Sequence, residues 1–238
     1  MNHEREKQYI VYLVIIFVVI AGIISINYYK KEKKTSDFIN ALESGSPMSR
    51  VTLLLKEDPG LVNARAKDGS TALYHAVAPD NIELVKLLVS KGADVNAKNK
   101  NKDGEIPLEK AIVKDQNILI FLVSKGADVN AKDNYGFTPL HIASYYRKQK
   151  SIDFLISKGA GVNITSLDGL TPLHCIITSS SEKQPNLSDE TMRCIELLIS
   201  KGANVNIKDK MGDTPLARAL RFHRTDIADL LRKHGVKE

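Results

Sequence analysis

The sequence contains too few cysteines to form a disulfide framework. Only Cys175 and Cys194 occur among its 238 residues, and they do not form a C-x-x-C pair. Both fall at apolar positions of a helical pattern, so we expect buried, unpaired thiols that pack as small apolar side chains.

Motifs of catalysis and of cofactor binding are also missing. The chain has no glycine-rich phosphate loop, no H-E-x-x-H zinc motif and no G-x-S-x-G nucleophile motif. We therefore predict that the protein is not an enzyme and that it takes no cofactor and no small-molecule substrate.

Neither sign of charge dominates the sequence. The 34 Lys and Arg residues exceed the 28 Asp and Glu residues by six. Residues 1–34 hold six basic and three acidic side chains, which leaves 28 basic and 25 acidic ones in the rest, an excess of three in each part. Because a nucleic-acid-binding surface needs a concentrated basic patch, this even distribution gives no reason to expect a nucleic-acid partner.

One long apolar segment lies near the N-terminus. Residues 9–26 carry no charge, and the charge-free window extends from Gln8 to Tyr29. Eighteen helical residues span about 27 Å at about 1.5 Å per residue, close to the roughly 30 Å hydrocarbon core of a bilayer. We predict a transmembrane helix over residues 8–29, between a tail of residues 1–7 and a basic juxtamembrane linker of residues 30–35.

Cleavage and orientation of this helix are separate questions. A signal peptide has an apolar region of about 7–15 residues and a small-x-small cleavage site, and residues 21–25 contain no such pair. A retained helix is therefore favoured over a secreted protein with a cleaved signal peptide. The four lysines within residues 30–34 favour the cytoplasmic side for the C-terminal part, but Arg5 and Lys7 in the short tail leave the opposite orientation open.

The rest of the chain is repetitive. Five glycines, each followed by a phrase similar to T-P-L-H, are spaced 35, 32, 33 and 43 residues apart, at Gly69, Gly104, Gly136, Gly169 and Gly212. About twenty residues later comes a second phrase similar to LLVSKGADVNAK. It ends at Lys98, Lys132, Thr165 and Lys208, and a shortened copy ends at Lys237.

These two phrases resemble those of the ankyrin repeat over five units from Gly69 to Val236. The resemblance implies an all-α solenoid over residues 36–238, built of stacked helix-turn-helix units with hairpin loops between them. We place an atypical first unit at about 36–67 and the five repeats at about 68–102, 103–134, 135–167, 168–210 and 211–238.

The residues of each unit agree with this fold. Thr138 suits the N-cap of a first helix, and Pro139 suits its first turn, where a missing N–H costs nothing. Glycines such as Gly92 follow the second helix, where a left-handed residue is needed. Repeat two departs from the pattern, with Ile106 in place of the threonine. Repeat four carries an insertion over about 180–188, which we interpret as a mobile loop before a helix that starts near Asp189.

Two histidines occupy the same position in successive repeats. The resemblance implies that His141 and His174 bond the backbone of a neighbouring loop. No cluster of Cys, His and carboxylate residues has the spacing of zinc ligands, so we predict structural histidines and no metal site.

Ankyrin repeats contact partners through their loop tips and the exposed positions of the first helices, and this carries over to the present sequence residue by residue. In repeats three to five these positions hold mainly aromatic residues, Met and Arg, which protein interfaces favour. We predict that a protein partner binds there, on one concave face, although scattered apolar surface residues are also normal. The predicted partner-binding residues are Tyr135, Phe137, Tyr145, Tyr146, Leu167, Leu170, Met211, Arg221 and Phe222.

Two functions follow from the sequence. The first is a membrane-tethered scaffold that binds a protein partner near the bilayer. The alternative is an accessory or structural subunit of a membrane complex, whose helix packs against other membrane proteins. Ala21, Gly22 and Ser25 form only a small patch without a G-x-x-x-G motif, which favours the first function.

Overall fold

The computed structural model describes residues 2–101, 103–178 and 187–235. Within these ranges the fold is all-helical, and its nearest approach to a sheet is one isolated bridge between Arg65 and Thr71. The elements are α1 (Asn2–Glu43), α2 (Met48–Glu57), η1 (Pro59–Asn63), α3 (Ala72–Ala76), α4 (Ile82–Ser90), α5 (Pro107–Lys114), α6 (Gln116–Ser124), α7 (Pro139–Tyr145), α8 (Gln149–Ser157), α9 (Pro172–Thr178), α10 (Leu187–Ser200), α11 (Pro215–Arg221) and α12 (Thr225–Lys233).

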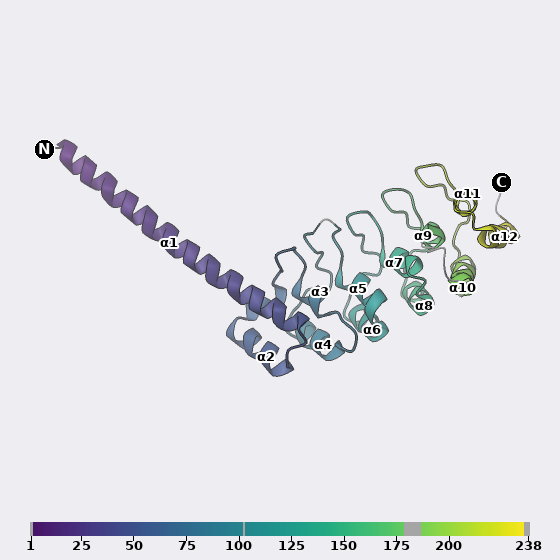
Figure 1. The fold of residues 1–238 in the computed structure, drawn as a ribbon, viewed down its shortest axis with the longest axis horizontal. Coiled ribbons are helices and arrows are strands. Elements are labelled where there is room, and N and C mark those ends of the chain that lie inside the picture. Colours follow the sequence, from purple (N-terminus) through teal and green to yellow (C-terminus); the bar gives the residue numbers. More distant parts are fainter. Residues whose placement is uncertain (1, 102, 179–186, 236–238) are drawn as a thin grey trace.

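The helices stack in two rows, which confirms the predicted solenoid (Figure 1). The first helix of each repeat belongs to one row (α3, α5, α7, α9 and α11), and the second helix belongs to the other (α4, α6, α8, α10 and α12). The loop before each first-row helix projects from that side of the stack, and we call these loops fingers 1 to 5 (residues 64–71, 94–106, 128–138, 161–171 and 204–214).

The core is continuous along the stack because each repeat contributes apolar side chains to both of its neighbours. Leu140 of α7 and Leu155 of α8 are fully buried, as are Leu173 of α9 and Leu198 of α10. Helix α7 packs against both α5 and α9. No helix pair could bury its apolar face alone, so the stability of each unit depends on the next one.

Asparagines connect each unit to the next through hydrogen bonds. The amide Nδ2 of Asn96 donates to the carbonyl of Gly126 at 3.0 Å, and its Oδ1 accepts from the N–H of Asp128 at 2.8 Å. Asn63, Asn130 and Asn163 make equivalent pairs of bonds to the units that follow them. These asparagines end the repeated V-N phrase of the sequence. The accepting glycines, such as Gly126 with φ 88°, adopt the left-handed conformation that the sequence predicts.

The N-terminal helix continues well beyond the predicted span. Helix α1 runs for 42 residues, so residues 30–35, expected as a linker, are helical. Its last turns bury Phe38, Ile39 and Leu42 in the core. The end of α1 is therefore the first helix of the first unit, and α2 is the second.

The N-terminal part of α1 projects away from the stack (Figure 1). Side chains 12–34 are all exposed. The segment Tyr12–Glu43 contains an 18-residue window with a mean hydropathy of 2.2, none of it buried within the protein. By length and composition this helix is able to cross a membrane.

Repeat four differs from the prediction at one boundary. Helix α10 begins at Leu187, two residues before the expected start near Asp189. Residues 180–186 of the predicted insertion loop lie outside the described residues.

The two histidines bond the next finger, as the resemblance implies. Nδ1 of His141 accepts from the N–H of Thr138 at 3.0 Å, so Nε2 carries the proton and donates to the carbonyl of Leu170 at 2.8 Å. Burial lowers the pKa of His141 to about 4, which keeps the ring neutral for this role. His174 forms the same bridge from Thr171 to the carbonyl of Asp213, and burial lowers its pKa as well.

Glu109 takes the histidine position in repeat two. Its Oε2 accepts from the N–H of Ile106 at 3.2 Å, the same bond that histidine Nδ1 accepts in repeats three and four. The side chain is only 4% exposed, and Oε1 has no hydrogen-bond partner among the described residues. Burial, the main cause, raises the pKa of Glu109 to about 8. At neutral pH the carboxyl group therefore stays protonated and is able to donate a hydrogen bond, as the neutral histidines do.

This environment predicts a stabilising substitution, Glu109→Gln. The folded chain holds the Glu109 proton up to about pH 8, whereas the unfolded chain releases it near the ordinary value of 4.5. The wild type therefore loses stability as the pH rises through this window, and a neutral Gln does not. We expect Glu109→Gln to unfold at nearly the wild-type temperature at pH 5 and to be more stable by a few kcal/mol at pH 8.5, because the wild type loses up to about 1.4 kcal/mol per pH unit between the two pKa values.

Thermal unfolding followed by circular dichroism at both pH values measures this difference. The control is Glu83→Gln, which neutralises an exposed carboxylate of α4 paired with Lys86 and should show no such dependence on pH. An equal effect of Glu109→Gln at both pH values would show that the Glu109 carboxyl is ionised in the folded protein.

Candidate partner-binding surface

Most of the predicted partner-binding side chains are exposed. The exposed fractions of Tyr135, Tyr145, Tyr146, Leu167, Met211 and Phe222 lie between 39% and 69%. Phe137 and Leu170 are half-buried, and Arg221 is exposed. The structure separates these nine residues into two sets, one on the fingers and one at the C-terminal ends of first-row helices.

The finger set consists of Tyr135, Phe137, Leu167, Leu170 and Met211. The N–H of Leu167 donates to the carbonyl of Tyr135 on the preceding finger at 2.8 Å, and the hydroxyl of Tyr135 donates to Asp103 on the finger before that at 3.0 Å. The tip of finger 5 is joined to finger 4 by the N–H of Lys210, which donates to the carbonyl of Asp168 at 2.9 Å. Tyr135, Leu167 and Met211 therefore form an apolar row across three successive fingertips.

Side-chain oxygens hold these fingertips in a fixed conformation, and in finger 4 Oγ of Ser166 accepts from the N–H groups of Asp168 and Leu170. The carboxylate of Asp133 accepts from the N–H groups of Tyr135 and Phe137, both at 2.8 Å. Asp209 accepts in the same way from Met211 and Asp213. The exposed side chains of the finger set are thus presented on an ordered backbone, which lowers the entropy lost when a partner binds.

The helix-end set consists of Tyr145, Tyr146, Arg221 and Phe222. Tyr145 is the last residue of α7 and Tyr146 is its C-cap, and their rings meet edge to face with centroids 5.2 Å apart. Phe222 is the C-cap of α11, the equivalent position two repeats further on. Helix α9 packs between α7 and α11, so it separates the tyrosines from Phe222.

Arg221 links the two sets within repeat five. Its guanidinium forms an ion pair with Asp213 of finger 5 at 2.7 Å, and Nη1 also lies 3.7 Å from the sulfur of Met211. The sequence predicts Arg221 as a contact residue but gives no sign of this internal pairing. Any partner that contacts Arg221 meets a guanidinium whose charge is partly compensated.

The sequence pattern also misses Leu220, which is 45% exposed on α11. A helical pattern places a leucine at this position in the core. Instead, Leu220 lines a shallow cleft of about 690 Å³ together with Leu216 and Ala217.

The thiols and the polar clusters of the described residues lack the features of reactive groups. Cys175 and Cys194 are free and buried as predicted, and burial, the main cause, raises their pKa values to about 12 and about 11. Within the described ranges, no group of three His, Cys, Asp or Glu side chains is able to hold a metal ion.

One polar cluster has the connectivity of a hydrolase triad. Nε2 of His75 lies 2.5 Å from Oγ of Ser70, and its Nδ1 lies 2.7 Å from the carboxylate of Glu43. Ser70 is only 1% exposed, however, and its hydroxyl also contacts Asp68, so no substrate is able to reach it. The cluster instead fastens finger 1 to the end of α1, a contact that no local sequence signal indicates.

Comparison with known protein families agrees with the geometry. A family model for ankyrin repeats, in three copies, matches residues 38–133, 99–166 and 158–238. These ranges include the end of α1, so the match covers the first unit as well as the five repeats. Ankyrin repeats form protein–protein interaction modules, typically without enzymatic activity. The chain belongs to the ankyrin-repeat family.

Proposed function

We propose that this protein is a membrane-tethered module that binds a partner protein through the fingers and first-row helices of repeats three to five. The observation that carries the proposal is the distribution of exposed apolar side chains. Among the described residues of the fingers and of α3, α5, α7, α9 and α11, every exposed large apolar side chain belongs to repeats three to five. Exposed aromatic side chains and Met on a rigid backbone are the usual anchors of protein interfaces.

The apolar helix supports the tether. Residues 8–29 are long and apolar enough to cross a bilayer, and the side chains of residues 12–29 are exposed. Because α1 continues into the first unit, a membrane anchor would hold the solenoid directly at the bilayer surface. The lysines of residues 30–34 favour the cytoplasmic side for the solenoid.

The tether predicts how the full-length protein fractionates. An inserted apolar helix resists alkaline carbonate and high salt, because neither weakens the burial of its side chains in lipid. We expect the full-length chain to remain in the membrane pellet under both treatments. Recovery of a soluble mature chain that begins after about residue 25 would instead support a cleaved signal peptide.

The partner-binding surface predicts where binding energy is concentrated. Truncation of an aromatic anchor at a desolvated interface centre typically costs about 2 kcal/mol or more. We therefore expect Tyr146→Ala to weaken the partner by about 30-fold or more, since about 1.4 kcal/mol is a factor of ten. The full-length protein, solubilised from native membranes, serves first to capture the partner and then to measure its affinity.

Ile120→Ala is the matched control. Ile120 lies on α6 in the other row and is 44% exposed, against 46% for Tyr146, so its removal should leave binding unchanged. Lys100→Ala on finger 2 should alter mainly the salt dependence of binding. Circular dichroism should show changes in stability below about 0.5 kcal/mol for all three variants. Normal binding by Tyr145→Ala and Tyr146→Ala, combined with loss of binding on a change within residues 180–188, would locate recognition in the insertion instead.

A further inference from the structure

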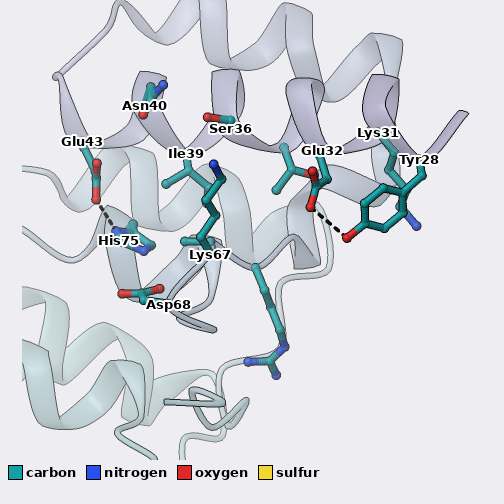
Figure 2. A pocket seen from close by; sticks show the side chains of 13 residues that line it. Tyr28, Lys31, Glu32, Ser36, Ile39, Asn40, Glu43, Lys67, Asp68 and His75 are labelled. Atoms are coloured by element: carbon teal, nitrogen blue, oxygen red, sulfur yellow. Dashed lines mark hydrogen bonds and ion pairs between the residues drawn. The ribbon is translucent and has the colours of Figure 1, made fainter. Parts of the chain in front are cut away.

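A cleft of about 670 Å³ lies between α1 and finger 1 (Figure 2). Helix α1 contributes one wall, which includes Tyr28, Lys31 and Ile39. The other wall includes Arg65 and Lys67 of finger 1. The cleft runs along α1 from Tyr28 to Glu43, a length of about 22 Å at about 1.5 Å per residue.

The carboxylates that line the cleft are already engaged within the protein. Glu32 accepts from the hydroxyl of Tyr28 at 2.8 Å, and Glu43 pairs with His75 at 2.7 Å. Asp68 accepts from the N–H of Ser70 at 2.9 Å and from its hydroxyl. These bonds fix the positions of the acidic groups, and none of the three carboxylates pairs with a lysine or arginine of the cleft among the described residues.

The cations of the cleft lack such partners. Among the residues that the structure describes, neither Lys31 nor Lys67 forms a hydrogen bond or an ion pair. Arg65 donates to the carbonyls of Gly69 and Lys98, which are neutral acceptors. Figure 2 shows Lys67 reaching from finger 1 toward α1 beside Ile39, with Lys31 at the Tyr28 end of the cleft. The ammonium groups of Lys31 and Lys67 are therefore free to contact an anion in the cleft.

The position of the cleft along α1 determines which anion is able to reach it. Tyr28 lies at the end of the charge-free window, and Lys31 follows within one turn. If residues 8–29 span the bilayer, as proposed above, this end of the cleft lies at the depth of the lipid phosphates, where tyrosines and lysines of membrane helices commonly reside.

We propose that this cleft binds the phosphate of an anionic phospholipid, with Lys31 and Lys67 contacting the phosphate from opposite walls. This inference rests on the proposed membrane tether. A bound headgroup bridges α1 and finger 1, so it fixes the angle at which the solenoid leaves the membrane. Free phosphate in solution has the same chemistry, and the experiment distinguishes the two sources.

Lipid binding to the full-length protein is measured by native mass spectrometry from detergent. The protein is titrated with phosphatidylglycerol, with phosphatidylcholine, or with inorganic phosphate. We expect one phosphatidylglycerol to bind in preference to phosphatidylcholine, and the double variant Lys31→Gln/Lys67→Gln to weaken it by at least about tenfold. Inorganic phosphate at millimolar concentration should not displace the lipid.

The control is Lys33→Gln/Lys100→Gln, which removes the same charge from one lysine of α1 and one fingertip lysine outside the cleft. It should change lipid affinity by no more than about twofold. Equal losses in the two double variants would show diffuse charge attraction and overturn the site. Binding of inorganic phosphate that competes with the lipid would assign the cleft to a soluble anion. Carbonate resistance without any lipid preference would refute this inference and leave the tether intact, whereas extraction by carbonate would refute the tether itself.

Discussion

The burial of an apolar face between neighbouring repeats is the constraint on which the rest of this structure depends. A pair of short helices such as α7 and α8 offers one apolar face to each neighbour, and neither face is buried unless the next unit is in place. Hydrogen bonds between neighbouring units then fix the distance and orientation of each unit relative to the next, which apolar packing alone does not determine. Asn96 bonds the next unit near the second-row helices, and His141 bonds the next finger. Each interface between neighbouring units is therefore stabilised by apolar burial and given one defined geometry by hydrogen bonds.

The same constraint explains the role of α1. The first repeat also needs a neighbour on its N-terminal side, and the last turns of α1 supply it with Phe38, Ile39 and Leu42. The 2.7 Å contact between Nδ1 of His75 and the Glu43 carboxylate adds a polar contact on the finger side. One continuous helix therefore both closes the end of the solenoid and extends toward the proposed membrane. No break in α1 separates its apolar part from the first unit of the solenoid in the structure.

The repeated phrases made most of the solenoid predictable. The capping threonines, the prolines of the first turns and the left-handed glycines are local signals, and they recur often enough to establish the period. The continuity of α1 had no such signal, because the charged residues 30–34 suggest a linker when only local composition is considered. The contact of Glu43 with His75 joins residues 32 positions apart in the atypical first unit, where the pattern is weakest. Glu109 was visible as a departure from T-P-L-H, but its burial could be seen only in three dimensions. The position of each residue within its repeat likewise predicted the exposed residues of repeats three to five. It did not predict that they separate into a finger set and a helix-end set.

The central claim is that one continuous helix joins the apolar segment to the first unit of the solenoid. Its most direct test is the distance between spin labels at Lys30→Cys on α1 and Lys150→Cys on α8, measured by pulsed electron paramagnetic resonance in lipid nanodiscs. Both positions are exposed, and the native thiols are buried with raised pKa values, so labelling should be selective. A continuous α1 predicts a single narrow distance distribution. A broad distribution, typical of a flexible connection between the membrane helix and the first unit, would contradict it.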